Sequence, residues 1–191
     1  ALTGPGGRSY TETRSSFSAG AVAMSQRYPF PIPCGWFQVC RPDEVAVGTS
    51  RALFYFDRHL VAWRDEEGVL HVQDAFCPHL GAHLGHGGSV EGCELQCPFH
   101  GWRFDAEGTN VDIPYSTRTN KRARLRTFPV HEVNGKSMVW YHPDPDVAPR
   151  WDIPALDDLT SGEFFGPVYT DHTVQAHAQE LGENAVDSAH F

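Results

Sequence analysis

Residues 77–102 read CPHLGAHLGHGGSVEGCELQCPFHGW and are the most informative part of the chain. They hold two short motifs separated by seventeen residues, Cys77-Pro-His79 and Cys97-Pro-Phe-His100. Each motif offers one thiolate and one imidazole on a Gly- and Pro-rich loop. These are donor types that bind iron or zinc in proteins.

Two alternatives compete with an iron–sulfur site. The first is that these residues are ordinary core cysteines and histidines, which the coincidence of two half-motifs at this spacing disfavours. The second is a Cys₂His₂ zinc site. Zinc fingers place both cysteines in one knuckle and both histidines on one helix, whereas here each loop carries one of each. The spacing therefore disfavours zinc as well.

The segments 77–85 and 97–102 resemble the cluster loops of Rieske iron–sulfur proteins. The resemblance implies a [2Fe–2S] cluster in which two cysteines hold one iron and two histidines hold the other. The implied ligands are Cys77, Cys97, His79 and His100. Neutral imidazoles raise the potential of such a cluster to roughly −150 to +300 mV. Backbone N–H groups of the two loops are expected to point at the sulfurs.

Two positions in the loops differ from one class of Rieske proteins and so limit which class this chain resembles. Rieske proteins of respiratory cytochrome complexes carry an extra, disulfide-forming cysteine in each loop, and Ala82 and Phe99 stand at those positions here. This implies the lower-potential type found in Rieske ferredoxins and non-haem oxygenases. Three cysteines outside the motifs are expected to be buried thiols: Cys34, Cys40 and Cys93. His83 and His86 are expected to be solvated loop histidines rather than surplus ligands. Trp102 and Phe104 are expected to be core residues rather than part of an electron path.

Composition limits the possible partners. The 191 residues carry a formal charge of −9, which argues against nucleic acid as a partner. An acidic surface would suit a redox partner with basic residues. No apolar run approaches the roughly 20 residues that span a bilayer, and no signal peptide is recognisable. An odd count of five cysteines argues against a disulfide framework. We therefore expect a cytoplasmic protein without a membrane span.

The pattern predicts a mainly β fold, with an antiparallel sandwich or barrel carrying the two cluster loops. Strands are expected at residues 51–56, 60–63, 69–72, 102–104, 125–131 and 137–141, and Asn134-Gly135 predicts a hairpin turn. Four segments are expected: a flexible extension (1–27), the Rieske-like domain (28–142), a Pro-rich linker (143–162) and the beginning of a second domain (163–191). The last is predicted to start with a strand over 165–178 and a helix from 179 onward, as in an α+β catalytic domain.

Asn184, Asp187 and His190 are spaced i, i+3, i+6 and would lie near one face of that helix. Alone, such a series most often marks a solvated face. After a Rieske-like domain it resembles the start of the catalytic domain of Rieske non-haem iron oxygenases. The resemblance implies that His190 is the first ligand of a mononuclear Fe(II), that Asp187 bridges to a Rieske histidine of a neighbouring subunit, and that Asn184 lies near the iron. With one ligand of the two-His-one-carboxylate triad, these 191 residues are not expected to bind that iron well.

The longer runs 77–88 and 96–104, together with Ile113-Pro-Tyr, resemble the steroid- and sterol-oxidising branch. That branch includes the Neverland-type cholesterol 7-desaturases and the 3-ketosteroid 9α-hydroxylases, and residues 174–184 fit the desaturase side best. The implied function is O₂-dependent hydroxylation or desaturation of a steroid-like hydrophobic substrate. Electrons would come from NAD(P)H through a separate reductase or ferredoxin, and the bridge implies a homotrimer.

Two other functions remain open. One is a Rieske ferredoxin-like carrier without oxygenase activity, in which residues 184–190 would have no role. The other is a relic that binds a cluster and turns nothing over. An oxygenase predicts three irons in the full-length protein and substrate-dependent O₂ uptake, whereas a carrier predicts two irons and no such uptake.

Overall fold

The computed structural model describes residues 31–159, 161–163, 165 and 168–190. Ile32–Tyr169 form one compact unit, and the described residues from Thr170 onward belong to a second. All strands of the described residues lie in the first unit and pair antiparallel. The mainly β, antiparallel prediction is therefore confirmed.

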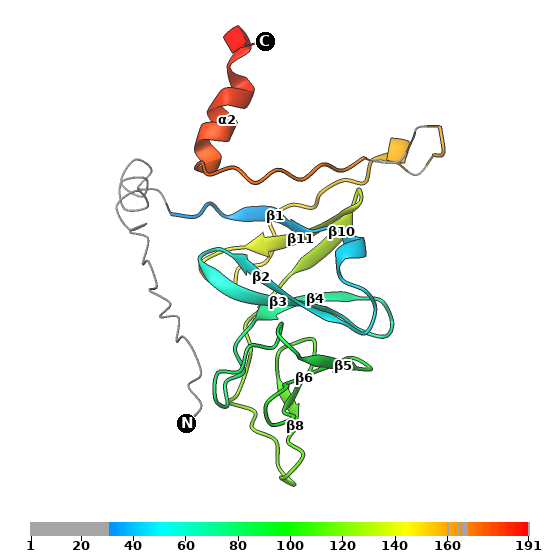
Figure 1. The fold of residues 1–191 in the computed structure, drawn as a ribbon, viewed down its shortest axis with the longest axis vertical. Helices are drawn as coiled ribbons and strands as arrows, with labels where there is room; N and C mark the ends of the chain where they lie inside the picture. The colour runs from blue at the N-terminus through cyan, green and yellow to red at the C-terminus, as the bar shows by residue number, and fades with distance from the viewer. Residues whose placement is uncertain (1–30, 160, 164, 166–167, 191) are drawn as a thin grey trace, which may run out of the picture. The chain divides into compact units, whose positions relative to one another are not determined.

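The strands form three small sheets (Figure 1). The first has the order β1 (Gly35–Cys40), β11 (Lys136–Tyr141), β10 (Val130–Val133). The second has the order β2 (Ser50–Tyr55), β3 (Arg58–Arg64), β4 (Leu70–Asp74), β9 (Thr127–Phe128). The third has the order β5 (Ser89–Glu91), β6 (Glu94–Gln96), β7 (Arg103–Phe104), β8 (Asn110–Asp112). A short 3₁₀ turn, η1 (Pro42–Glu44), follows β1.

Turn chemistry accounts for the hairpin that was expected at Asn134-Gly135. Both residues have positive φ, 54° and 71°, as a two-residue hairpin turn requires. They connect β10 and β11, whose register runs from Val133↔Lys136 to Val130↔Val139. The other expected strands also form, with ends shifted by a few residues, except that segment 125–131 divides into β9 and β10.

The central strand β3 is buried on both faces. Leu60 and Ala62 pack into a core with residues of the first sheet, whereas Val61 and Trp63 pack into the core that contains Cys77 and Cys97. Strand side chains alternate between faces, so one strand serves two cores. In Figure 1 the β2–β3–β4 sheet lies between the other two sheets.

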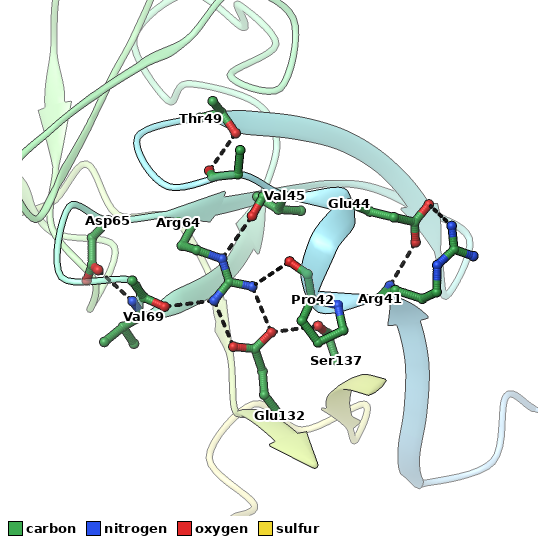
Figure 2. Close-up of polar contacts among 12 residues, drawn as sticks. Arg41, Pro42, Glu44, Val45, Thr49, Arg64, Asp65, Val69, Glu132 and Ser137 are labelled. Atoms are coloured by element: carbon green, nitrogen blue, oxygen red, sulfur yellow. Dashed lines mark hydrogen bonds and ion pairs between the residues drawn. The ribbon is translucent and has the colours of Figure 1, made fainter. Parts of the chain in front are cut away.

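A buried cation connects this strand to its surroundings. Arg64, at the end of β3, is 8% exposed and donates to the carbonyls of Pro42, Val45 and Gly68. It also makes a two-pronged contact with the carboxylate of Glu132 on β10, at 2.8 Å for each N–O pair (Figure 2). The guanidinium thus joins β3, the η1 turn and the first sheet.

The Pro-rich segment after β11 packs within the first unit. The ring of Trp151 lies 4.7 Å from that of Trp140, and its carbonyl accepts from the indole N–H of Trp36. Asn134 binds this segment twice, donating to the Pro154 carbonyl and accepting from the Leu156 N–H. The segment ends in a 3₁₀ turn, η2 (Asp157–Leu159).

In the second unit, helix α2 (Ala178–Val186) is followed by a 3₁₀ turn, η3 (Ser188–His190). The helix prediction is confirmed, but the strand expected over 165–178 is not formed by the described residues of that segment. A strand needs hydrogen bonds from a neighbouring strand, and none of the described strands pairs with this segment. No helix in the described residues is long and apolar enough to cross a bilayer. The expected N-terminal extension lies outside the described residues.

Candidate metal centre

The two cysteine motifs form the same turn. Cys77 donates its N–H to the Ala82 carbonyl, five residues on, and accepts from the Gly81 N–H, both at 2.9 Å. Cys97 repeats this pattern with Trp102 at 2.8 Å and Gly101 at 3.1 Å. Both turns have Pro after the cysteine and Gly at the fifth position. The two turns differ at their third and fourth positions, which are His79 and Leu80 in the first turn and Phe99 and His100 in the second.

Both cysteines are held inside the protein. Cys77 is 2% exposed and Cys97 is 3% exposed, in the core beside β3. Burial raises the pKa of the Cys77 thiol to about 11, even though the backbone N–H groups of His79 and Leu80 donate to its sulfur. A thiolate in this position therefore needs a metal to stabilise it. The expected N–H groups pointing at a sulfur are present in the first turn.

The two histidines lie nearer the surface. Both His79 and His100 are partly exposed, with ring centroids 4.8 Å apart and planes at 71°. Within the described residues, Nδ1 of His100 is buried without a hydrogen-bond partner. A buried ring nitrogen that lacks a partner is costly unless it binds a ligand.

The donor set fits a two-iron cluster better than a single ion. Tetrahedral zinc would require four donors within roughly 4 Å of one another. In the described chain, no three of these four side chains bring their donor atoms within 4.8 Å of each other. Two buried thiols and two outer imidazoles match the Cys₂His₂ division between two irons of a Rieske cluster.

Trp102 connects the site to the surface. It is 7% exposed, as expected for a core residue, and its ring stacks on His79 at 4.5 Å with planes 5° apart. Its indole N–H donates to the hydroxyl of Tyr115 at 2.7 Å. The core position of Trp102 was expected, whereas its contact with a candidate ligand was not. Its position two residues after His100 was the available signal.

Two of the three cysteines outside the motifs were assigned wrongly. Cys40 is buried as predicted, and burial raises the pKa of its thiol. Cys34 and Cys93 are exposed. Cys93 lies in the turn between β5 and β6, and its thiol donates to Glu67 at 2.8 Å. A strand pattern over residues 89–96 does not reveal a two-residue turn within it.

The loop histidines differ from each other. His86 is exposed, as expected, but His83 packs against the rings of His59, Phe76 and His86 at centroid distances of 4.3 to 5.4 Å. Desolvation lowers the pKa of His83, and the nearby histidines lower it further. His83 is therefore not the solvated residue that was expected.

The second constellation does not lie on one continuous helix. Asn184 is in the last turn of α2, but the helix ends at Val186, and Asp187 adopts an extended backbone with ψ of 93°. The Asp187 carboxylate accepts from the Ala189 N–H at 3.0 Å, which starts the next turn. This local bond competes with helix continuation. The backbone of His190 lies in η3. The three residues therefore do not lie on one helix, as had been expected.

Two family models match the chain. The model described as Rieske [2Fe–2S] domain matches residues 35–129. The model described as 3-ketosteroid 9α-hydroxylase C-terminal domain matches residues 139–191.

Curated relatives are similar over most of this chain. Cholesterol 7-desaturase nvd of Xenopus laevis is 39% identical over 169 residues, covering 88% of this chain and 37% of the relative. The oxygenase component of 3-ketosteroid-9-alpha-monooxygenase of Rhodococcus rhodochrous is 33% identical over 159 residues, covering 82% of this chain and 42% of the relative. The chain thus spans about two fifths of the length of these relatives.

Solved structures of an oxygenase are also similar to part of this chain. The crystal structure of dicamba monooxygenase matches with a TM-score of 0.57 and 30% identity, covering 63% of this chain and 38% of that one. A structure of the same enzyme with non-haem iron and dicamba matches with a TM-score of 0.58 and 29% identity, covering 64% of this chain and 37% of that one.

Proposed function

Because the chain belongs to the Rieske non-haem iron oxygenases, we propose that it is part of an oxygenase component that oxidises a steroid-like substrate. The observation that carries this proposal is the pair of equivalent turns that bring two buried thiols and two imidazoles together. The similarity of residues 139–191 to a steroid hydroxylase domain supports an oxygenase over a simple carrier. Similarity to a cholesterol desaturase and a ketosteroid monooxygenase supports the steroid class of substrate.

In this proposal the two turns hold a [2Fe–2S] cluster. Cys77 and Cys97 ligate the inner iron, and His79 and His100 ligate the outer one. When bound, such a cluster accepts and donates single electrons at a potential higher than that of an all-cysteine cluster. The chain keeps the thiolates away from water and leaves the two imidazoles partly exposed, so electrons enter and leave on the histidine side.

We propose roles in electron delivery and iron binding for the second constellation. His190 would be a ligand of a mononuclear Fe(II), Asp187 would connect it to a Rieske histidine of a neighbouring subunit, and Asn184 would lie near the iron. Support comes from the match of the C-terminal family model over these residues. The bridge would require a homotrimer. Electrons would come from an NAD(P)H-dependent reductase or ferredoxin, and O₂ would be the co-substrate. The cytoplasmic location stays a prediction.

The ligand assignment is tested by electron paramagnetic resonance of the dithionite-reduced protein. Cys77→Ser is expected to lose the Rieske signal, because serine does not replace a thiolate on iron. Cys93→Ser makes the same chemical change at an exposed thiol outside the turns and is expected to keep the signal. His100→Cys retains a ligating group and is expected to replace the Rieske signal with that of a cysteine-rich cluster.

A Rieske signal that survives in Cys77→Ser would contradict the assignment. Far-UV circular dichroism of both serine variants separates loss of a ligand from loss of the fold. If wild-type protein with bound iron shows no Rieske signal at all, the proposed function fails.

A further inference from the structure

A cationic segment begins three residues after Tyr115, whose hydroxyl accepts from Trp102 at the candidate centre, in a chain that is acidic as a whole. Five of the chain's 15 Lys and Arg residues lie within residues 118–126, and no Asp or Glu occurs between Asp112 and Glu132. The five are Arg118, Lys121, Arg122, Arg124 and Arg126. With a formal charge of −9, the chain as a whole predicts a basic redox partner. The local charge of residues 118–126 has the opposite sign.

The positive charge of this segment is not neutralised. Four of its basic residues are exposed, and Arg126 is partly buried. Among the ion pairs of the described residues, none involves the segment. Lys121 and Arg124 donate to the backbone carbonyls of Asn110 and Glu107 instead, at 3.3 and 3.4 Å. Backbone carbonyls orient these side chains without cancelling their charge.

A chain of contacts connects the segment to the candidate ligands. His79 stacks on Trp102, and Trp102 donates to the Tyr115 hydroxyl. Three residues after Tyr115, the Arg118 N–H donates to the Ser116 hydroxyl, which fixes the start of the segment. At its other end, Leu125 donates to the Gly108 carbonyl and belongs to the same core as Cys77. The residues at the two ends of the segment are therefore tied to the core and the ring contacts around the two turns.

Exposed apolar side chains adjoin the histidines in the sequence or are linked to His79 through Trp102. Leu80, Phe99 and Tyr115 are 65, 63 and 63% exposed. Leu80 follows His79 and Phe99 precedes His100. Protein–protein interfaces are enriched in aromatic residues and arginine, and a small apolar patch with a charged border suits a transient complex. The surface beside the centre has this composition.

We propose that the cationic segment 118–126 docks the electron donor, a small iron–sulfur or flavin protein with an acidic face. This inference rests on the proposed function, because it requires a cluster at the two turns. In each encounter the reduced donor loses one electron and the oxidised cluster gains it. The basic residues attract the donor and orient it, and the apolar patch brings its redox group close to His79 and His100. An acidic donor fits because opposite charges accelerate encounter and favour one orientation.

The probe is a plant-type acidic [2Fe–2S] ferredoxin, used with the cluster-loaded protein. Lys121→Gln/Arg122→Gln removes two positive charges from the segment. Lys136→Gln/Arg150→Gln removes one exposed lysine and one exposed arginine elsewhere and is the matched control. The rate constant for cluster reduction by reduced ferredoxin is measured by stopped flow. The Kd of oxidised ferredoxin is measured separately, without electron transfer.

We expect the segment variant to lower the rate constant about 10-fold at low ionic strength and to raise the Kd by a similar factor. The control is expected to stay within about 2-fold, and the difference should shrink in 0.5 M salt as charges are screened. Equal effects of variant and control, or a wild-type rate that does not fall with salt, would overturn the docking surface. A segment variant that changes the oligomeric state would assign the surface to a second copy of the chain and also overturn it. All forms must show the Rieske signal after dithionite, and its absence would overturn the proposed function instead.

Discussion

Arg64 is a cation placed where most side chains are apolar, and its contribution to stability depends on its partner Glu132. Its guanidinium satisfies three backbone carbonyls and the Glu132 carboxylate, so a buried charge is fully hydrogen-bonded. The hydrogen bonds from Arg64 lower the pKa of Glu132, and a bond from Ser137 lowers it further. The folded state therefore binds a proton at Glu132 less readily than the unfolded chain does.

This pair predicts a pH-dependent stability. Because the folded pKa of Glu132 is depressed, its contribution is fully present above the ordinary glutamate pKa of about 4.3 and is lost as the pH falls through the folded value. Glu132→Gln is expected to lower the free energy of unfolding by about 1–3 kcal/mol at pH 7, because Arg64 loses its counter-charge. The difference from wild type should shrink below about pH 4.

Urea unfolding at pH 7 and at pH 3.5 measures this difference. Asp74→Asn is the control, because Asp74 also pairs with an arginine, Arg58, but both side chains are 36% exposed. Such an exposed pair is expected to contribute less than about 1 kcal/mol. If the two variants lose the same stability at pH 7, burial is not what gives the Arg64 pair its strength.

At the scale of elements, the core around the cysteines depends on a close contact between the β7–β8 turn and the segment that contains Leu125. Gly108 lies in the turn between β7 and β8 with φ of 74°, and its carbonyl accepts the Leu125 N–H at 2.8 Å. A Cβ at Gly108 would lie 2.2 Å from the Leu125 carbonyl oxygen. The close approach positions the cationic segment and one wall of the core around the cysteines.

Gly108→Ala is therefore expected to destabilise the protein by about 3 kcal/mol, the sum of left-handed strain and a backbone collision. Gly68→Ala shares the positive φ, at 87°, but its Cβ would meet nothing within 4 Å. It should cost only about 1 kcal/mol from strain. Thermal or urea unfolding of the two variants compares them, and equal losses would show that the contact with Leu125 adds nothing.

Elements set by local chemistry were predictable from the sequence, whereas those set by distant partners were not. The Asn134-Gly135 hairpin and the two cysteine turns follow from residues within a few positions of each other. The strand expected over 165–178 depended on pairing that alternation alone does not reveal. The exposure of Cys93 depends on a turn inside a short strand pattern, and the helix break at Asp187 depends on one side-chain hydrogen bond. The contact between Trp102 and His79 joins two loops and has no local signature.

At the scale of the whole molecule, charge and iron content are the measurable properties. Residues 1–191 contain all four proposed cluster ligands. They contain one proposed ligand of the mononuclear iron, His190. A facial triad needs three protein ligands. The 191-residue chain should therefore load with two irons and not with three.

Iron analysis after reconstitution and desalting tests this expectation. Wild type and His190→Ala are both expected to hold two irons per chain, and Cys77→Ser is expected to hold almost none. A third iron in wild type that disappears in His190→Ala would mean that other residues of this chain complete the mononuclear site. Iron retained by Cys77→Ser would contradict the ligand assignment at the same time.

The double role of β3 limits how this domain can evolve. Leu60 and Ala62 fill one core, and Val61 and Trp63 fill the other. Inserting or deleting one residue would turn every side chain to the opposite face and so exchange the contents of the two cores. In most strands such a change exposes apolar groups on one side only, but here it would misfill both cores at once. Length variation among descendants should therefore accumulate in the turns at either end of β3, while the strand itself keeps its length.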